Sequence, residues 1–347
     1  MPVEPRIRAL KTAVPPFVLH QPDVRRLVRV LFSQRKDIDR LMPIFDHTGI
    51  ETRYSCVPID WYEQPHGWPE RTRLYAENSV TLLEKVARDC LDAAEFVPED
   101  IDAIVVASTT GVVTPSLDAL IAERLPLRRD VQRLPIFGLG CAGGLIGLAR
   151  AASLVRAYPH YRVLFLVVEM CGLSFRAHDL SKSNLVAAAL FGDGAAGAIL
   201  TSEGDGPVLG ACGEYTWKDS LNIMGWEIKD DGLKARFSRD IPALVDKNFH
   251  QVTQDFLRKH DISWQSIHGY VCHPGGAKVL NALERAFGLE AGALVESRSV
   301  LREFGNMSAP TALFVLERTN PWASKGRILM TALGPGFTAA YQVIETS

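Results

Sequence analysis

Three residues in glycine-containing motifs could do chemistry together: Cys141 in GLGCAGG, His273 in VCHPGG and Asn306 in FGNMSAP. A cysteine thiolate is a nucleophile, a histidine can take its proton, and an asparagine amide can stabilise a developing oxyanion. Each residue alone has a more ordinary role, because free cysteines are mostly buried and inert, single histidines are mostly structural, and asparagine often caps a helix. The chemistry therefore depends on elements that bring the three side chains to one place.

Cys141 lies where a predicted strand passes into a predicted helix. The run Leu134 to Leu139 is apolar, and the stretch from Gly144 to Val155 has the apolar spacing of a helix. The glycines between them allow a sharp backbone turn. At the start of a helix, free backbone N–H groups and the helix dipole favour a thiolate, so we expect a lowered pKa for this cysteine.

Two parts of the chain repeat the same spacing. The apolar strand 101–108 ends 33 residues before Cys141, and the strand that runs up to His273 ends 33 residues before Asn306. The next apolar strands, YRVLFL and GRILMT, begin 20 residues after the cysteine and the asparagine. This predicts two duplicated halves, and equivalent strand ends would meet if the halves pack about a pseudo-twofold axis.

The composition is that of a large globular protein. The chain has 347 residues, 47% hydrophobic and 22% charged, with a net charge of −2 and no basic block, which argues against a nucleic-acid partner. The N-terminus lacks the apolar core of a signal peptide, and no apolar run is long enough to span a membrane. The six cysteines form no CxxC pair. We therefore expect no zinc site, no disulfide framework, and a cytoplasmic protein.

Helix and strand patterns alternate along the chain and indicate an α/β fold. Apolar residues recur at helical spacing over 73–94 and 241–259, whereas strands 101–109 and 161–169 are apolar without alternation. Such strands are usually covered on both faces, so we expect mainly parallel sheets. The glycine-rich stretch 205–240 is expected to be irregular.

The motifs GLGCAGG, FGDGAA, VCHPGG, GNMSAP and LGPGF are similar, in order and spacing, to those of type III polyketide synthases, the chalcone synthase-like family. The resemblance runs from about Gly49 to Val343. It implies a thiolase-like αβαβα sandwich of five layers, built from two duplicated halves, and a homodimer. The N-terminal half, 1–205, would carry the nucleophilic cysteine, and the C-terminal half, 206–347, the histidine and the asparagine.

The resemblance also implies roles for single residues. Cys141 would carry the acyl group, with His273 and Asn306 assisting the decarboxylation of malonyl-CoA. Phe191 would be a gating phenylalanine, and Thr114 would reach the cavity of the partner subunit.

Further residues are assigned to the substrates. The positions that would line the cavity are Cys171, Ser174, Phe237 and Ser308, although Cys171 could equally serve only in packing. Arg40 and Lys278 are candidates for contacts with the phosphates of CoA, although both could be ordinary solvated charges. The resemblance implies acyl-CoA and malonyl-CoA as substrates and no metal or redox cofactor.

The finer class of product is less tightly defined. The segment MGWEI, from Met224 to Ile228, resembles bacterial members that make alkylresorcinols or alkylpyrones from fatty acyl starters, and ALGPG departs from the plant pattern. A tetrahydroxynaphthalene-type synthase that uses malonyl-CoA alone is an alternative. So are a chain-initiating ketoacyl-carrier-protein synthase, a catalytically dead acyl-CoA-binding protein and a cysteine hydrolase.

Overall fold

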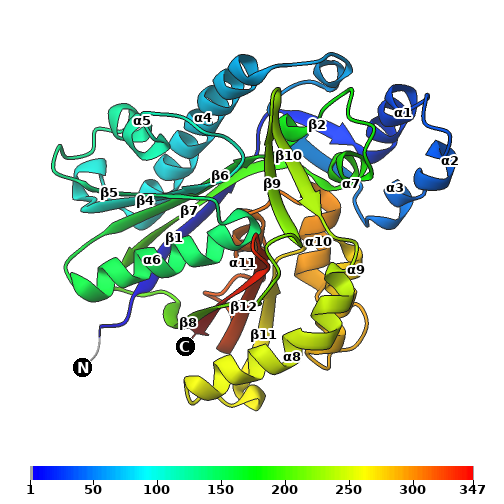
Figure 1. Cartoon of the computed structure of the whole chain (residues 1–347). Helices are drawn as coiled ribbons and strands as arrows, with labels where there is room; N and C mark the ends of the chain where they lie inside the picture. The colour runs from blue at the N-terminus through cyan, green and yellow to red at the C-terminus, as the bar shows by residue number, and fades with distance from the viewer. Residues whose placement is uncertain (1–2, 347) are drawn as a thin grey trace.

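A mixed sheet of nine strands runs through the molecule in a computed structural model that describes residues 3–346 (Figure 1). Neighbouring strands follow the order β11 (Ile267–Cys272), β12 (Gly326–Gly334), β13 (Thr338–Thr346), β8 (Val208–Thr216), β1 (Arg6–Ala13), β7 (Asp193–Thr201), β6 (Val163–Met170), β4 (Ala103–Ser108) and β5 (Gln132–Phe137). The remaining strands are β2 (Phe17–His20), β3 (Thr52–Ser55), β9 (Met224–Lys229) and β10 (Gly232–Phe237).

The strand pairing confirms the duplication that the spacing predicts. In the first half, β4 pairs parallel with β6, β6 antiparallel with β7, and β7 antiparallel with β1. In the second half, β11, β12, β13 and β8 repeat this series in the same order. The two halves of the sheet join where Arg6 of β1 pairs with Val208 of β8.

The expectation of mainly parallel sheets is wrong, because among the strand pairs of residues 3–346 only β4–β5, β4–β6 and β11–β12 are parallel. The strands lack alternation because helices cover both faces, whatever the strand direction. In β4, Ile104 and Val106 pack in one apolar cluster, whereas Val105 and Ala107 pack in another. Both faces of this strand are therefore hydrophobic.

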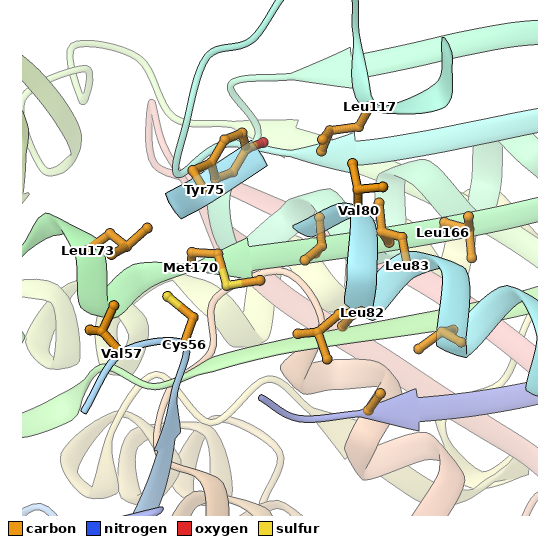
Figure 2. Close-up of a cluster of buried hydrophobic side chains, with 14 of the residues drawn as sticks. Cys56, Val57, Tyr75, Val80, Leu82, Leu83, Leu117, Leu166, Met170 and Leu173 are labelled. Atoms are coloured by element: carbon orange, nitrogen blue, oxygen red, sulfur yellow. The ribbon is translucent and has the colours of Figure 1, made fainter. Parts of the chain in front are cut away.

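Three apolar clusters separate the layers of the sandwich. The first lies under α4 (Trp68–Ala94), where Val80 and Leu83 approach Leu166 of β6 (Figure 2). The second surrounds α6 (Gly143–Ala157) and α11 (Thr311–Thr319), which pack between the two halves of the sheet. The third lies under α8 (Ile241–Lys259) and α9 (Ala277–Ala286). This arrangement gives the αβαβα order of layers.

The other helices lie at the edges of these layers. They are α1 (Gln21–Leu31), α2 (Ile38–Leu41), α3 (Ile44–His47), α5 (Leu117–Arg124), α7 (Lys182–Leu190) and α10 (Val295–Phe304). Among residues 3–346, no helix combines the length and the apolar character needed to cross a membrane.

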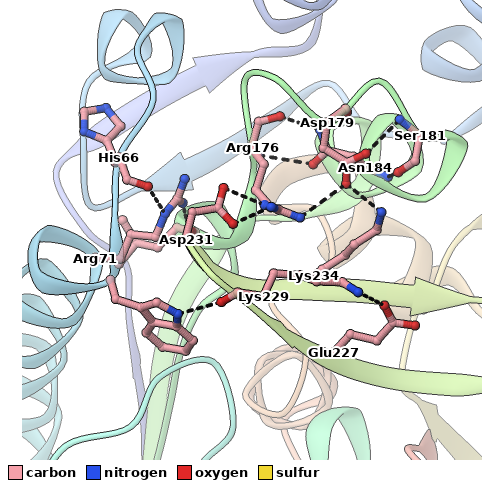
Figure 3. A network of polar contacts seen from close by, with 12 residues as sticks. His66, Arg71, Arg176, Asp179, Ser181, Asn184, Glu227, Lys229, Asp231 and Lys234 are labelled. Atoms are coloured by element: carbon pink, nitrogen blue, oxygen red, sulfur yellow. Dashed lines mark hydrogen bonds and ion pairs between the residues drawn. The ribbon is translucent and has the colours of Figure 1, made fainter.

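The stretch 205–240 is more regular than expected. It forms β8 and a hairpin of β9 and β10, which pair only with each other. Ion pairs fasten this hairpin to the segment before α7: Arg176 Nε lies 2.8 Å from Asp231 Oδ2, and Lys234 Nζ lies 2.8 Å from Asp179 Oδ2 (Figure 3). The glycines that suggested a loop lie partly in this hairpin, at Gly225 and Gly232, and partly in and before β8, at Gly206, Gly210 and Gly213.

Candidate active site

Cys141 lies at the expected junction between strand and helix. The chain leaves β5, passes Gly138 with φ +89° and Gly140 with φ +47°, and enters α6 after a short turn of 3₁₀ helix. A Cβ atom on Gly140 would lie 2.6 Å from Cδ of Pro335. Glycine is therefore required there by both the backbone angle and the close approach of the second half.

His273 and Asn306 occupy the equivalent ends in the second half. The backbone N–H of His273 donates to the carbonyl of Thr331 at 2.8 Å, which continues the pairing of β11 with β12. Asn306 precedes α11, and its Oδ1 accepts a hydrogen bond from the N–H of Ser308 at 2.8 Å. Its Nδ2 is 3.4 Å from the carbonyl of Gly275.

The structure brings the three residues together around one large cavity. Cys141, His273 and Asn306 all line it, and its volume is about 510 Å³. Apolar side chains make up most of the remaining wall, and they are Leu41, Ile44, Leu185, Val186, Leu190, Met224, Phe237, Ile241, Phe249, Val279, Leu283 and Leu333. The cavity can therefore hold a bulky apolar substrate beside the cysteine.

Burial determines the charge state of the cysteine and the histidine. It raises the pKa of the Cys141 thiol to about 12 and lowers the pKa of His273 to about 4. The expectation of a lowered thiol pKa is wrong for this structure, because the loss of hydration outweighs the helix dipole. Both ring nitrogens of His273 lack a hydrogen-bond partner within the part of the chain that is described. The resting site thus holds a neutral thiol and a neutral imidazole with both nitrogens available to a substrate.

A buried carboxyl group supports the cysteine turn. Glu169 Oε2 accepts hydrogen bonds from Oγ1 of Thr110 at 2.7 Å and from the N–H of Thr109 at 3.0 Å. Oγ1 of Thr109 in turn accepts the N–H of Gly140 at 2.9 Å. Burial raises the pKa of Glu169 to about 7. The sequence analysis missed this support, although Glu169 is the single charge in the apolar strand β6.

The candidate gating residue Phe191 contacts Phe237, and a tryptophan joins the two rings. The ring centroids of Phe191 and Phe237 are 5.5 Å apart, and Trp226 stacks on Phe191 at 5.7 Å. Phe237 lines the large cavity, whereas Phe191 lines a smaller hollow next to it. Trp226 was not predicted as a site residue, because no local spacing shows that the hairpin folds back over α7.

Cys171 and Ser174 line the smaller hollow rather than the large cavity. This hollow has a volume of only about 40 Å³ and lies between mainly apolar side chains of α1, α7 and the turn after β6. Cys171 is fully buried, and burial raises the pKa of its thiol. Ser174 Oγ donates to the carbonyl of Cys171 at 2.6 Å. The expectation that both residues line the cavity of Cys141 is therefore wrong for this structure.

The other predicted residues fall into three places. Ser308 is buried, with its Oγ 3.4 Å from the Sγ of Cys141. Arg40 and Lys278 are exposed and line the large cavity, where Lys182 and Arg239 join them. The last two escaped the sequence analysis because they come from elements distant in the chain. Thr114 is exposed on the loop after β4 and lines neither the large cavity nor the smaller hollow.

The chain matches a known protein family over most of its length. Residues 4–204 match the N-terminal domain of chalcone and stilbene synthases, and residues 216–345 match their C-terminal domain. The chain belongs to the chalcone and stilbene synthase family. As a member of this family it is a type III polyketide synthase, an acyl-transferring condensing enzyme.

Relatives of this type III polyketide synthase match along nearly the whole chain. A putative chalcone synthase of Bacillus subtilis is 37% identical over 96% of both chains. A 1,3,6,8-tetrahydroxynaphthalene synthase of Streptomyces peucetius is 35% identical, over 98% of this chain and 92% of its own. The crystal structure of 1,3,6,8-tetrahydroxynaphthalene synthase from Streptomyces coelicolor superposes with a TM-score of 0.93 at 26% identity, covering 99% of this chain and 100% of that chain. Family membership favours polyketide synthesis over a chain-initiating ketoacyl-carrier-protein synthase.

Proposed function

We propose that this enzyme loads an acyl group on Cys141 and extends it with malonyl-CoA by decarboxylative Claisen condensation, before cyclisation to a resorcinol or a pyrone. The observation that carries the proposal is the convergence of Cys141, His273 and Asn306 on one large apolar cavity. A nucleophile, a base and an amide donor are the groups that acyl transfer and enolate formation need.

Acyl loading uses the neutral thiol and imidazole. The Sγ of Cys141 gives its proton to His273 and bonds to the thioester carbonyl carbon of the starter. The carbon–sulfur bond to CoA then breaks, and the CoA thiolate leaves with the proton from the histidine. Burial disfavours each charge alone, but in a low dielectric the attraction between thiolate and imidazolium offsets part of this cost.

Extension uses the asparagine. The bond between the carboxylate and C2 of malonyl-CoA breaks, CO2 leaves, and the electron pair forms an enolate of acetyl-CoA. The Nδ2 amide of Asn306 and a ring N–H of His273 stabilise the enolate oxygen. The enolate carbon attacks the thioester on Cys141 and expels the cysteine thiolate, which gives a β-ketoacyl-CoA extended by one acetate unit.

The cations around the large cavity suit the phosphates of CoA. Arg40, Lys182, Arg239 and Lys278 line this cavity together with its apolar wall. Lysine and arginine are the common binding groups for phosphate. We therefore place the nucleotide end of CoA at these residues and its thioester at Cys141.

We further propose a fatty acyl starter, because the cavity wall is mostly apolar and includes Met224 and Phe237 of the hairpin. A synthase that uses malonyl-CoA alone is the second candidate, and the 35% identity to a tetrahydroxynaphthalene synthase favours it. The purified enzyme should be given malonyl-CoA alone and malonyl-CoA with acetyl-, aromatic and fatty acyl-CoA, with products followed by mass spectrometry.

Each outcome of this experiment distinguishes one activity. Faster turnover with fatty acyl-CoA supports the proposal, whereas equal or better turnover of malonyl-CoA alone favours the second candidate. Release of free acid without a new carbon–carbon bond would show a hydrolase. Labelling of Cys141 in a stoichiometric amount without turnover would show an acyl-CoA-binding protein.

We also propose that the enzyme is a homodimer joined at β5. This strand is an edge of the nine-stranded sheet, and Leu134 and Phe137 on it are 38% and 62% exposed. An exposed edge with apolar side chains is suited to pairing with a second copy. Thr114 lies on the loop that follows the neighbouring strand β4, so a partner at this edge would come close to it.

A further inference from the structure

Arg53 is a large, fully buried side chain without an acidic hydrogen-bonding partner. It is 2% exposed, and its Nη1 donates to the backbone carbonyl oxygens of Ala188 at 2.5 Å and Phe191 at 3.3 Å. Its Nε and Nη2 have no hydrogen-bond partner among residues 3–346. Burying a guanidinium without a carboxylate is costly. Packing alone therefore does not explain why an arginine occupies this position.

The carbonyl groups that Arg53 binds belong to the C-terminal end of α7. The last carbonyl groups of a helix have no partner within the helix, and a positive charge there is favourable. The carbonyl of Leu190, which lies between Ala188 and Phe191 in the chain, accepts a hydrogen bond from the backbone N–H of Asn306 at 2.8 Å. The N–H of Gly192 then donates to the carbonyl of Asn306 at 3.1 Å. Arg53 and Asn306 are thus bound to the same helix end.

The two residues before Arg53 form hydrogen bonds with the segment that precedes Asn306 in the chain. Oγ1 of Thr52 donates to the carbonyl of Glu303 at 2.7 Å. The N–H of Glu51 donates to the carbonyl of Arg302 at 2.8 Å. Both acceptors lie in the last turn of α10, just before the turn that carries Asn306. The segment 51–53 therefore binds the C-terminal ends of both α7 and α10, and Asn306 lies between these two helix ends.

We propose that Arg53 is a positioning residue that holds the amide of Asn306 at the enolate, and so serves decarboxylation and condensation rather than acyl loading. This inference rests on the proposed function. Cys141 is positioned by β5, α6 and Glu169, none of which contacts the guanidinium of Arg53 through a hydrogen bond. Displacement of an oxyanion donor by about 1 Å can lower a rate about 100-fold. The two half-reactions should therefore respond differently to the loss of this side chain.

The test compares Arg53→Met with Arg53→Lys, and uses Arg26→Met, at an exposed arginine of α1, as the matched control. For each variant, CO2 release from labelled malonyl-CoA and the rate of acylation of Cys141 are measured, with kcat and KM separated. We expect Arg53→Met to lower kcat for decarboxylation about 10- to 100-fold and to change acylation less than about threefold. Arg53→Lys should restore part of the loss, because lysine can still donate to the carbonyl groups.

A proportional fall in both half-reactions, or parental rates in both, would overturn the inference. If Arg53→Met does not fold, the same split measured on Arg53→Lys decides, with a smaller expected loss of about 3- to 10-fold. Asn306→Ala separates this inference from the proposed function. If Asn306→Ala keeps parental decarboxylation, the proposed function is wrong. If Asn306→Ala loses it while both Arg53 variants keep it, only the role of Arg53 is wrong.

Discussion

The Sγ atom of Cys141 lies 3.4 Å from the Oγ atom of Ser308, and the two residues come from opposite halves of the duplicated chain. Ser308 has φ +59° and donates its N–H to Oδ1 of Asn306. The proposed nucleophile therefore touches the same turn that carries the amide proposed to stabilise the enolate. Under this proposal, acyl loading and extension use one junction, formed where the N-terminal ends of α6 and α11 meet.

Replacing the nucleophile should separate the two half-reactions. Cys141→Ala should form no polyketide, because no other group of the site can take the acyl chain. It should still release CO2 from malonyl-CoA, since His273 and Asn306 remain to stabilise the enolate. The measurement is radiolabelled CO2 release beside mass spectrometry of the acyl-enzyme. Normal condensation by this variant would contradict the role of the cysteine.

The two partners of the cysteine should show complementary losses. Asn306→Ala should keep acyl labelling of Cys141 and lose decarboxylation by about 100- to 1000-fold, the usual cost of one oxyanion donor. His273→Ala should impair both half-reactions, because the histidine serves the thiol and the enolate. The same two assays, run on both variants, check this. Equal effects of the two substitutions on both assays would be inconsistent with separate roles.

The turn before the cysteine should tolerate a methyl group poorly. Gly140→Ala forces φ +47° on a side chain and places its Cβ 2.6 Å from Pro335, so we expect a loss of about 2–5 kcal/mol in the free energy of unfolding. Gly138→Ala is the matched control, because φ is +89° there but no atom lies within 4 Å of the added Cβ. It should cost only about 1–2 kcal/mol. Urea denaturation measures both, and equal losses would refute the steric part.

Stability should depend on pH through the buried histidine. Burial lowers the pKa of His273 to about 4, below its ordinary value of about 6.5 in the unfolded chain. Between these values the unfolded chain binds more protons, so the contribution of this group to stability falls as the pH is lowered from 6.5 to 4. The total change is on the order of 3 kcal/mol. The difference in unfolding free energy between the parent and His273→Gln should follow this window, and a difference independent of pH would rule it out.

The proposed dimer can be disrupted at its edge strand. Phe137→Glu places a charge on the exposed strand β5, where burial against a second copy would be unfavourable. We expect a shift towards monomer at micromolar concentration, measured by sedimentation, with a loss of activity if Thr114 completes the partner's cavity. Val295→Glu, at an equally exposed residue of α10, should leave the dimer intact. A fully active monomer of the parent protein would refute the dimer proposal.

Local sequence patterns predicted the elements that carry the chemistry. The glycines around Cys141 defined its turn, and the repeated spacing placed His273 and Asn306 at equivalent ends, because duplicated strands and helices have nearly fixed lengths. The protonation states were not predictable, since burial of the thiol depends on Ser308 and on the packing of the other half. The support from Glu169 was equally hidden, because a single acid in a strand does not show which backbone groups it accepts from.

The hairpin of β9 and β10 is a larger element that the sequence patterns did not predict. It lies in the glycine-rich stretch that was expected to be irregular, and its pairing is confined to its own two strands. Its contacts with the rest of the protein include ion pairs between residues far apart in the chain, such as Arg176 with Asp231 and Lys234 with Asp179. Patterns of period two or 3.6 do not report such contacts. Phe191 and Trp226 therefore meet through tertiary structure alone.

Because this hairpin forms a separate two-stranded sheet, it offers a route by which related enzymes can come to make different products. It supplies Met224 and Phe237 to the cavity wall and Trp226 to the stack on Phe191, yet it shares no strand pairing with the nine-stranded sheet. We expect substitutions of Met224 or Phe237 to alter the shape of the cavity without breaking a strand pair of that sheet, whereas substitutions on α6 or α11 should disturb the core between its two halves. Variation in this hairpin, by evolution or by protein engineering, is therefore a route to products of a different chain length.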